Sequence, residues 1–214
     1  VAVYHRRPEN DPESPIIDLS SAGEADWLRV LSRNDALVNC AGVFQDNATD
    51  STDAVHRSCV EALVYCAERA GIRRVFLFSA IGMDRAQPTP FSRSKYAGDR
   101  IVERSKLNWV ILRPSVVLGR PAYGGSALFR GLAALPVQLR FNDAKPIQPV
   151  HLDDVAETVS LMLGADAPSK IVLELAGPDV LTVEEVVRHY RCWLGRKPAM
   201  MLSLPKRLMK LLYV

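Results

Sequence analysis

Short apolar runs alternate along this chain with longer stretches whose apolar residues recur at helical spacing. This alternation is typical of βαβ units, in which helices cover a parallel sheet. The runs that we expect to form strands are 1–4, 36–39, 74–79, 109–112 and 171–175. The stretches that we expect to form helices are 24–31, 52–70, 122–135 and 153–163. Two further helices are expected to begin at Pro90 and at Thr182. The pattern therefore predicts an α/β fold with a doubly wound parallel sheet.

Two helix ends carry their own signals. Gly71 stands where a left-handed C-cap is wanted, and Thr182 with Glu185 forms a capping box. From Gly119 the periodicity loosens, since Pro and Gly recur, and it returns only near 153. We therefore expect a dinucleotide-binding domain over 1–118 and 148–176, and a small substrate or partner lobe over 119–147 and 177–214.

The composition is that of an ordinary globular protein, with 48% apolar and 24% charged residues. The four cysteines form no CxxC pair and have no histidine at metal-ligand spacing, so we expect no metal site and buried free thiols. Free thiols and the lack of a signal peptide favour a reducing, cytoplasmic compartment. The three tryptophans, Trp27, Trp109 and Trp193, are expected to be core or half-buried packing residues.

The net charge of +3 hides an asymmetry along the chain. From Val186 to the end there are seven basic residues and no acid, whereas the rest carries 20 basic and 24 acidic side chains. This tail fits either a solvated helix face or an anionic surface. Because it lacks interleaved aromatics, nucleic acid is not expected, which leaves a membrane face or a partner protein. The apolar run 208–214 fits either a closing helix or the approach to a membrane segment.

Ligands of an open parallel sheet bind at the carboxyl ends of its strands, so the residues just after each strand matter most. After the first strand come Arg6 and Arg7 with no acid, which favours the 2′-phosphate of NADP over NAD, unless they form only a basic surface turn. Asp18 and Leu19 fit either an adenine contact or a helix cap. The small residues Asn39, Cys40, Ala41 and Gly42 would let the backbone approach a flat ligand.

Six segments resemble the short-chain dehydrogenase/reductase superfamily, in the order of its motifs: 37–42, 67–75, 78–82, 92–99, 111–119 and 150–156. They look most like the atypical, extended branch that includes the NAD(P)-binding accessory subunit of respiratory complex I and its bacterial relatives, some of which carry C-terminal membrane helices. The resemblance covers nearly the whole chain and implies a Rossmann-like fold with a small C-terminal substrate lobe.

The resemblance also implies roles for individual residues. Ser79 matches the serine that hydrogen-bonds a substrate carbonyl, and Lys95 matches the lysine that holds the nicotinamide ribose and lowers the pKa of a catalytic tyrosine. The segment of Pro114, Ser115 and Val116 matches the lining of the nicotinamide. Asn39 to Gly42 match the loop along the adenosine half, and Asp18 matches the adenine contact.

Two departures from the family pattern change the expected activity. Phe91 occupies the tyrosine position, and a phenyl ring offers no proton. Tyr96 would point about 140° away around the helix, while Ser92 or water would relay a proton poorly. The second departure is the absence of the glycine-rich turn that binds the pyrophosphate in this family. No segment of this sequence resembles that turn, and we expect it upstream of Val1.

These observations favour a nicotinamide-dinucleotide-binding protein that uses its cofactor mainly for structure or redox sensing. One alternative is a working NADPH-dependent reductase, isomerase or epimerase that manages with Ser79 and Lys95. Another is a non-catalytic interaction scaffold at the membrane or at a respiratory complex.

Overall fold

The computed structural model describes residue 17 and residues 22–32, 34–48, 50–85, 87–121, 124–140 and 144–203. These residues form two compact units, one within Val1–Arg113 and Val159–Glu174, the other within Pro114–Thr158 and Leu175–Val214. Each unit has its own cluster of buried hydrophobic side chains. The division expected from the sequence has different limits, and its assignment to a dinucleotide domain and a substrate lobe stays a prediction.

The first unit is built on a four-stranded sheet with the order β1-β2-β3-β7. The strands are β1 (Ala36–Asn39), β2 (Arg74–Phe78), β3 (Asn108–Pro114) and β7 (Ile171–Leu175). β2 pairs in parallel with β1 and with β3, which places Asn39 opposite Leu77 and Phe78 opposite Leu112. The expected α/β fold with a parallel sheet is therefore confirmed. The strand predicted over 1–4 lies outside the described residues.

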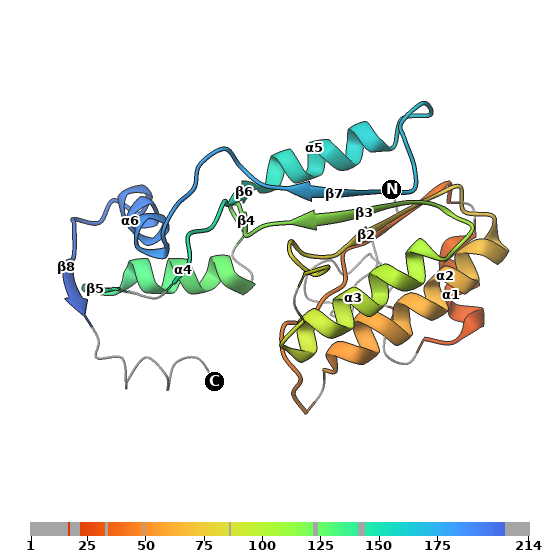
Figure 1. The fold of residues 1–214 in the computed structure, drawn as a ribbon, viewed down its shortest axis with the longest axis horizontal. Coiled ribbons are helices and arrows are strands. Elements are labelled where there is room, and N and C mark those ends of the chain that lie inside the picture. Colours follow the sequence, from red (N-terminus) through yellow and green to blue (C-terminus); the bar gives the residue numbers. More distant parts are fainter. Residues whose placement is uncertain are drawn as a thin grey trace. The chain divides into compact units, whose positions relative to one another are not determined.

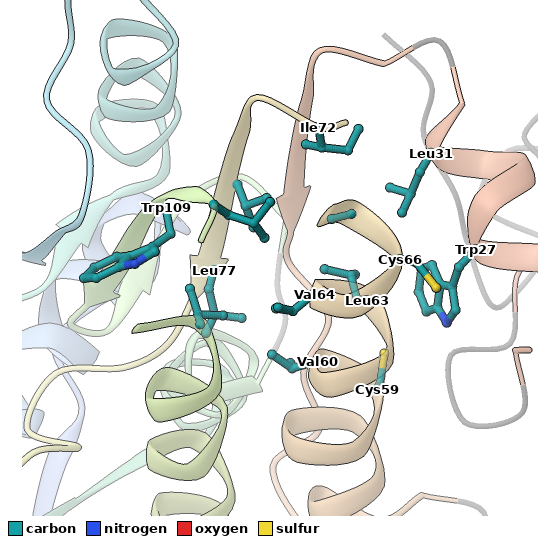
Figure 2. Close-up of a cluster of buried hydrophobic side chains, with 14 of the residues drawn as sticks. Trp27, Leu31, Cys59, Val60, Leu63, Val64, Cys66, Ile72, Leu77 and Trp109 are labelled. Carbon is teal, nitrogen blue, oxygen red and sulfur yellow. The ribbon is translucent and has the colours of Figure 1, made fainter. Parts of the chain in front are cut away.

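Helices α2 (Cys59–Ala70) and α3 (Pro90–Glu103) lie on one face of this sheet, and α1 (Glu24–Leu31) packs on α2 (Figure 1). α2 is apolar on two sides because it lies between the sheet and α1. In Figure 2, Trp27 and Leu31 of α1 lie on one side of α2, and Leu77 and Trp109 of the strands lie on the other. Burial on both sides explains why this helix alternates polar residues with so many Val, Leu and Cys residues.

The ends of these helices follow the signals in the sequence. Gly71 takes the left-handed conformation at the end of α2, with φ of 72°. Thr89 caps α3, since its Oγ1 accepts a hydrogen bond from Ser92 N at 3.1 Å, and Pro90 takes the first helical position. The predicted helix 52–70 is wrong in one respect, because residues Ala54–Ser58 form a five-residue π turn, η2.

The π turn packs closely against α3. A Cβ atom built on Gly98 would lie 2.3 Å from the carbonyl oxygen of His56, so only glycine lets the two backbones meet here. This contact holds the wide turn in place and fixes where His56 stands.

Replacing Gly98 with alanine should destabilise the protein by about 1–3 kcal/mol, because α3 must move away from η2. Gly131→Ala is the matched control, since Gly131 also lies in a helix but a Cβ atom added there would meet no other atom within 4 Å. The control should be neutral or gain up to about 1 kcal/mol. Chemical denaturation measures both, and equal effects would contradict the packing argument.

The second unit contains two small parallel sheets. β4 (Val117–Leu118) pairs with β6 (Val150–His151), and β5 (Val137–Arg140) pairs with β8 (Met200–Ser203). The sequence did not predict these four strands, because they are short and lie where Pro and Gly interrupt the apolar pattern or next to the C-terminal basic residues. The second unit also contains α4 (Gly124–Ala134) and α6 (Val183–Trp193). These two helices pack on each other through the buried side chains of Phe129, Ala133, Val186 and Val187.

Two helices of the C-terminal half follow their predictions closely. α5 spans Leu152–Met162, and α6 begins after Thr182 as expected. The capping box at Thr182 is confirmed, since its Oγ1 accepts from Glu185 N at 3.2 Å and its own N–H donates to the Glu185 carboxylate at 2.8 Å.

Two expectations about packing need correction. All four cysteines are free, but only Cys59 and Cys66 are buried, whereas Cys40 and Cys192 are exposed. Trp27 and Trp109 are core residues as expected, but Trp193 is 63% exposed, because it lies at the end of α6 and stacks on Arg130 rather than entering the core. Across the described part of the chain, no helix has the length and apolar character needed to cross a membrane.

Candidate dinucleotide site

The carboxyl ends of three neighbouring parallel strands bring candidate residues together. Asn39 ends β1, Ser79 directly follows β2, and Arg113 stands near the end of β3. Ser79 is tied to the next strand by a 2.8 Å hydrogen bond from its N–H to Leu112 O. The buried Asn39 accepts a hydrogen bond from Ala41 N at 3.0 Å, which turns the chain tightly away from the sheet.

Lys95 reaches this edge from α3 and is nearly fully buried. Its ammonium donates to Phe78 O at 2.7 Å, just before Ser79. A Cβ atom on Gly42 would lie 3.5 Å from Lys95 Nζ and 3.6 Å from His56 Nε2, so the loop after β1, the lysine and the histidine meet at one point. A cavity of about 10 Å³ beside Asn39 and these side chains has room for about one water molecule.

Burial lowers the pKa of Lys95 from 10.5 to about 8, with the nearby Asp99 and Cys40 acting in the opposite direction. Desolvation is the main cause, because a buried ammonium loses its hydration. The lysine is thus a cation at neutral pH that gives up its proton readily.

This pKa predicts a pH-dependent stability. Between pH 8 and 10.5 the unfolded chain still holds the Lys95 proton, whereas the folded chain has released it. Since the unfolded state then binds more protons, the unfolding free energy of the wild type should rise with pH, relative to Lys95→Met, by about 3 kcal/mol in total. Denaturation of both proteins across this window measures the difference, and a constant difference would contradict the assignment.

His56 is a site residue that the sequence did not reveal. Its Nε2 accepts from Val43 N at 3.2 Å, its Nδ1 lies 3.0 Å from Ser94 Oγ, and Ser94 Oγ donates to Phe91 O at 3.0 Å. Burial, followed by the charge of Lys95, lowers the His56 pKa to about 3, so the ring is neutral with its proton on Nδ1. No sequence pattern could have placed His56 in this cluster, because its hydrogen-bond partners are a backbone amide and a hydroxyl group far away in the sequence.

Phe91 lies in the same cluster as these groups. Its ring centroid is 5.5 Å from that of His56, edge to face, and 5.2 Å from that of the exposed Phe44. Lys95 follows one helical turn later on the same face of α3. The hydroxyl of Ser92, which stands next to Phe91, is engaged in the N-cap, where it donates to Thr89 O at 3.0 Å. Phe91 thus places a hydrocarbon ring beside His56 and one helical turn before Lys95.

A buried charge cluster lies behind Ser79. Asp99, which is 0% exposed, accepts from Arg113 Nε at 3.1 Å and Nη2 at 2.9 Å, both at Oδ2. Burial raises the pKa of the Asp99 carboxyl, while Ser79, Arg113 and Lys95 act in the opposite direction. Within the described residues, Ser79 Oγ and Asp99 Oδ1 make no hydrogen bond of ordinary geometry. Asp99 stands four residues after Lys95, a helical spacing that could have suggested their proximity.

Arg113 also fixes the loop that follows β2. Its Nη1 lies 3.0 Å from Asp84 Oδ2, and the neighbouring Arg85 pairs with Glu174 at 3.2 Å. Gly82 takes a positive φ of 79° at the bend that separates Ser79 from Asp84 and Arg85. Two ion pairs therefore hold the loop that borders Ser79.

The structure places the other predicted site residues as follows. Cys40 is exposed, and partial burial of its thiol raises its pKa, so the thiol is protonated at neutral pH. Pro114, Ser115 and Val116 belong to the second unit, where Ser115 N donates to Leu175 O at 2.8 Å and Val116 O accepts from Val150 N at 3.0 Å. Arg6, Arg7, Asp18 and Leu19 lie outside the described residues.

The residues that the structure gathers fit part of a nicotinamide dinucleotide. Lys95 has three donor hydrogens but only the Phe78 carbonyl as acceptor among the described residues, so it has donors for ribose hydroxyls. Ser79 offers a buried hydroxyl that lies near Asp99 but makes no hydrogen bond of ordinary geometry within the same set of residues. Ala41 and Gly42 keep the loop free of bulky side chains. No group of three or more metal-ligating side chains occurs in the described segments.

A parallel α/β sheet with a serine, a buried lysine and a small-residue loop at its carboxyl edge fits an atypical protein of the short-chain dehydrogenase/reductase class. The chain belongs to the NAD(P)H-binding family, whose model matches residues 4–164. The family resemblance expected from the sequence is confirmed, and the cofactor class is a nicotinamide dinucleotide.

Known proteins agree with this membership. The chain is 24% identical over 157 residues to the mitochondrial NADH dehydrogenase (ubiquinone) 1 alpha subcomplex subunit 9 of Dictyostelium discoideum, a match that covers 73% of this chain and 44% of that protein. The chain thus spans less than half the length of that relative.

Solved structures share the fold. The UDP-glucose 4-epimerase of Thermus thermophilus in complex with NAD has a TM-score of 0.73 at 19% identity, with 100% of this chain and 85% of that chain covered. The enzyme WbmG of Bordetella bronchiseptica with NAD and UDP has a TM-score of 0.71 at 18% identity, covering 90% and 68% of the two chains.

Proposed function

We propose that this protein binds NADP(H) and uses it mainly as a structural or redox-sensing ligand, with catalysis impaired by Phe91. The observation that carries the proposal is the neighbourhood of Phe91, which packs against the neutral His56 while Lys95 and Ser79 keep their places at the sheet edge. Hydride transfer to a carbonyl needs a proton donor within about 3 Å of the oxygen. A dinucleotide bound here would supply the hydride, but the side chain at position 91 supplies no proton.

Within this proposal, Lys95 holds the nicotinamide ribose, and the loop from Asn39 to Gly42 lies along the adenosine half. Pro114 to Val116 line the nicotinamide. Arg6 and Arg7 receive the 2′-phosphate, which makes NADP the preferred dinucleotide, and Asp18 with Leu19 contacts the adenine. The buried hydroxyl of Ser79, which makes no hydrogen bond of ordinary geometry within the described residues, favours a second candidate function, a working NADPH-dependent reductase or epimerase.

Fluorescence enhancement of NADPH and NADH on adding the purified protein tests the binding role. We expect binding of both, tighter for NADPH, and a loss of NADPH affinity of about tenfold or more in Lys95→Met, which removes charge-assisted hydrogen bonds. Lys106→Met is the matched control, because Lys106 is exposed and lies past the end of α3. No enhancement with either nucleotide would refute the proposal.

We also propose that the second unit docks the protein on a partner. The relative from Dictyostelium discoideum is named as a subunit of NADH dehydrogenase, and the C-terminal part of this chain is basic. A position at the cytoplasmic face of the membrane, beside respiratory machinery, fits both observations.

A further inference from the structure

Two segments far apart in the sequence lie side by side in the second unit. α4 packs on α6, and β5 pairs with β8 from Val137 opposite Met200 to Arg140 opposite Ser203 (Figure 1). We call residues 124–140 and 186–203 together the basic-apolar lobe. Its basic residues are Arg130, Arg140, Arg188, Arg191, Arg196 and Lys197, and it contains no acidic residue. The fold thus extends the basic character of the C-terminal tail to α4 and β5, which the sequence alone did not link to it.

The same lobe gathers exposed hydrophobic side chains. In the described part of the chain, fourteen large hydrophobic residues are exposed, and seven of them belong to the lobe. They are Leu128, Leu135, Trp193, Leu194, Met200, Met201 and Leu202, with Met200 74% exposed. Single exposed apolar residues are ordinary, but such a concentration in one part of a fold marks an interaction surface.

The cations of the lobe differ in how far they are available to a ligand. Arg191 is buried and donates to Ala133 O at 2.7 Å and to Lys197 O at 2.8 Å, so it serves the fold. Among the described residues, Arg188 makes a long exposed pair with Glu185 at 3.6 Å and no other ion pair, and Lys197 is exposed. The acids of α6 stand in its first turn, so its cationic end is the end that joins β8.

Trp193 combines both properties. The Arg130 guanidinium lies 5.0 Å from its ring centroid, so an exposed indole and a cation are presented together. Indole and guanidinium groups beside Met and Leu side chains suit the boundary between lipid headgroups and acyl chains.

We propose that the basic-apolar lobe docks on the surface of an anionic lipid bilayer, with its apolar side chains in the headgroup region and its cations on lipid phosphates. The same lobe of a second copy is a poor occupant, because contact between two lobes would set cations against cations with no acid between them. Nucleic acid is also disfavoured, since exposed Met and Leu offer nothing to phosphates. This inference gives a surface and a ligand to the docking role proposed above.

Vesicle co-sedimentation of the full chain tests the proposal. We expect binding to vesicles of phosphatidylcholine with phosphatidylglycerol and little binding to phosphatidylcholine alone. Arg188→Gln with Lys197→Gln should lower the partition coefficient about 30-fold, given the contribution of each cation near an anionic surface. The matched control is Arg73→Gln with Lys106→Gln, which removes one ion-paired arginine and one exposed lysine from the first unit and should leave binding unchanged.

A second pair of variants separates insertion from mere charge attraction. Met200→Gln should lower vesicle binding several-fold, whereas Leu161→Gln, which alters a side chain 70% exposed in the first unit, should not. Equal binding to neutral vesicles, or equal losses in the controls, would overturn the proposal. So would a dimer that lobe variants dissociate, or binding to an acidic protein without binding to vesicles. NADPH fluorescence of each variant reports on the first unit, so a docking failure is distinguishable from failure of the dinucleotide site.

Discussion

Phe91→Tyr is expected to raise NADPH-dependent turnover of carbonyl compounds by about 10²–10⁴-fold, the usual contribution of general acid–base catalysis. The new hydroxyl would stand one helical turn before Lys95, whose positive charge favours the phenolate and so lowers the tyrosine pKa. Because the ring of Phe91 already packs between His56 and Phe44, one added oxygen should leave its position intact. Loss of NADPH absorbance with a panel of small carbonyl compounds measures the rate.

Phe44→Tyr is the matched control, since it adds the same hydroxyl to the neighbouring ring, which is 72% exposed. It should leave turnover at the level of the wild type. Adding Lys95→Met to Phe91→Tyr should remove most of the gain. If the wild type already reduces substrates at ordinary rates and tyrosine adds nothing, the proposed catalytic impairment is wrong.

Asp99→Ala is expected to destabilise the protein by about 3–5 kcal/mol. The change removes the buried carboxylate that accepts two hydrogen bonds from Arg113 and leaves this buried guanidinium with the partly exposed carboxylate of Asp84, and a buried charge that loses its buried partner is costly. Asp35→Ala removes an exposed carboxylate that pairs with Arg73 at 3.2 Å, so it should change stability little. Chemical denaturation at neutral pH compares the two variants.

A double variant distinguishes a lost charge pair from lost packing. Asp99→Ala combined with Arg113→Met removes both charges, and it should recover much of the stability that Asp99→Ala alone loses. If the free energy of unfolding of Asp99→Ala is no lower than that of Asp35→Ala, the buried pair does not contribute the stability proposed for it.

Much of the first unit could be predicted because its signals are local. The apolar run of β1 and the start of α3 at Pro90 each depend on a few adjacent residues, and both agree with the structure. The short strands β4, β5, β6 and β8 could not be predicted, because each is defined by its partner strand rather than by its own period. The exposure of Trp193 was missed for a related reason, since α6 ends where the packing of the second unit ends.

Only those candidate site residues that follow a strand or stand at a fixed position on a helix could be predicted from the sequence. Lys95, Ser79 and the loop ending at Gly42 stand at strand or helix positions that a parallel sheet brings together. The position of His56 and the pairing of Asp99 with Arg113 depend on three-dimensional contacts between elements. The spacing of these residues in the sequence therefore did not predict either of them.

The wide turn at Ala54–Ser58 sets the rotational phase of the chain that precedes it. One residue fewer in this turn would rotate that stretch by about 100° relative to α2. Thr52, now buried and donating its N–H to Asp46, would swing outward, while the contacts of α2 with the sheet would stay as they are. Loss of a single codon here should therefore disturb the segment from Asp46 to Thr52 far more than the hydrophobic core around α2.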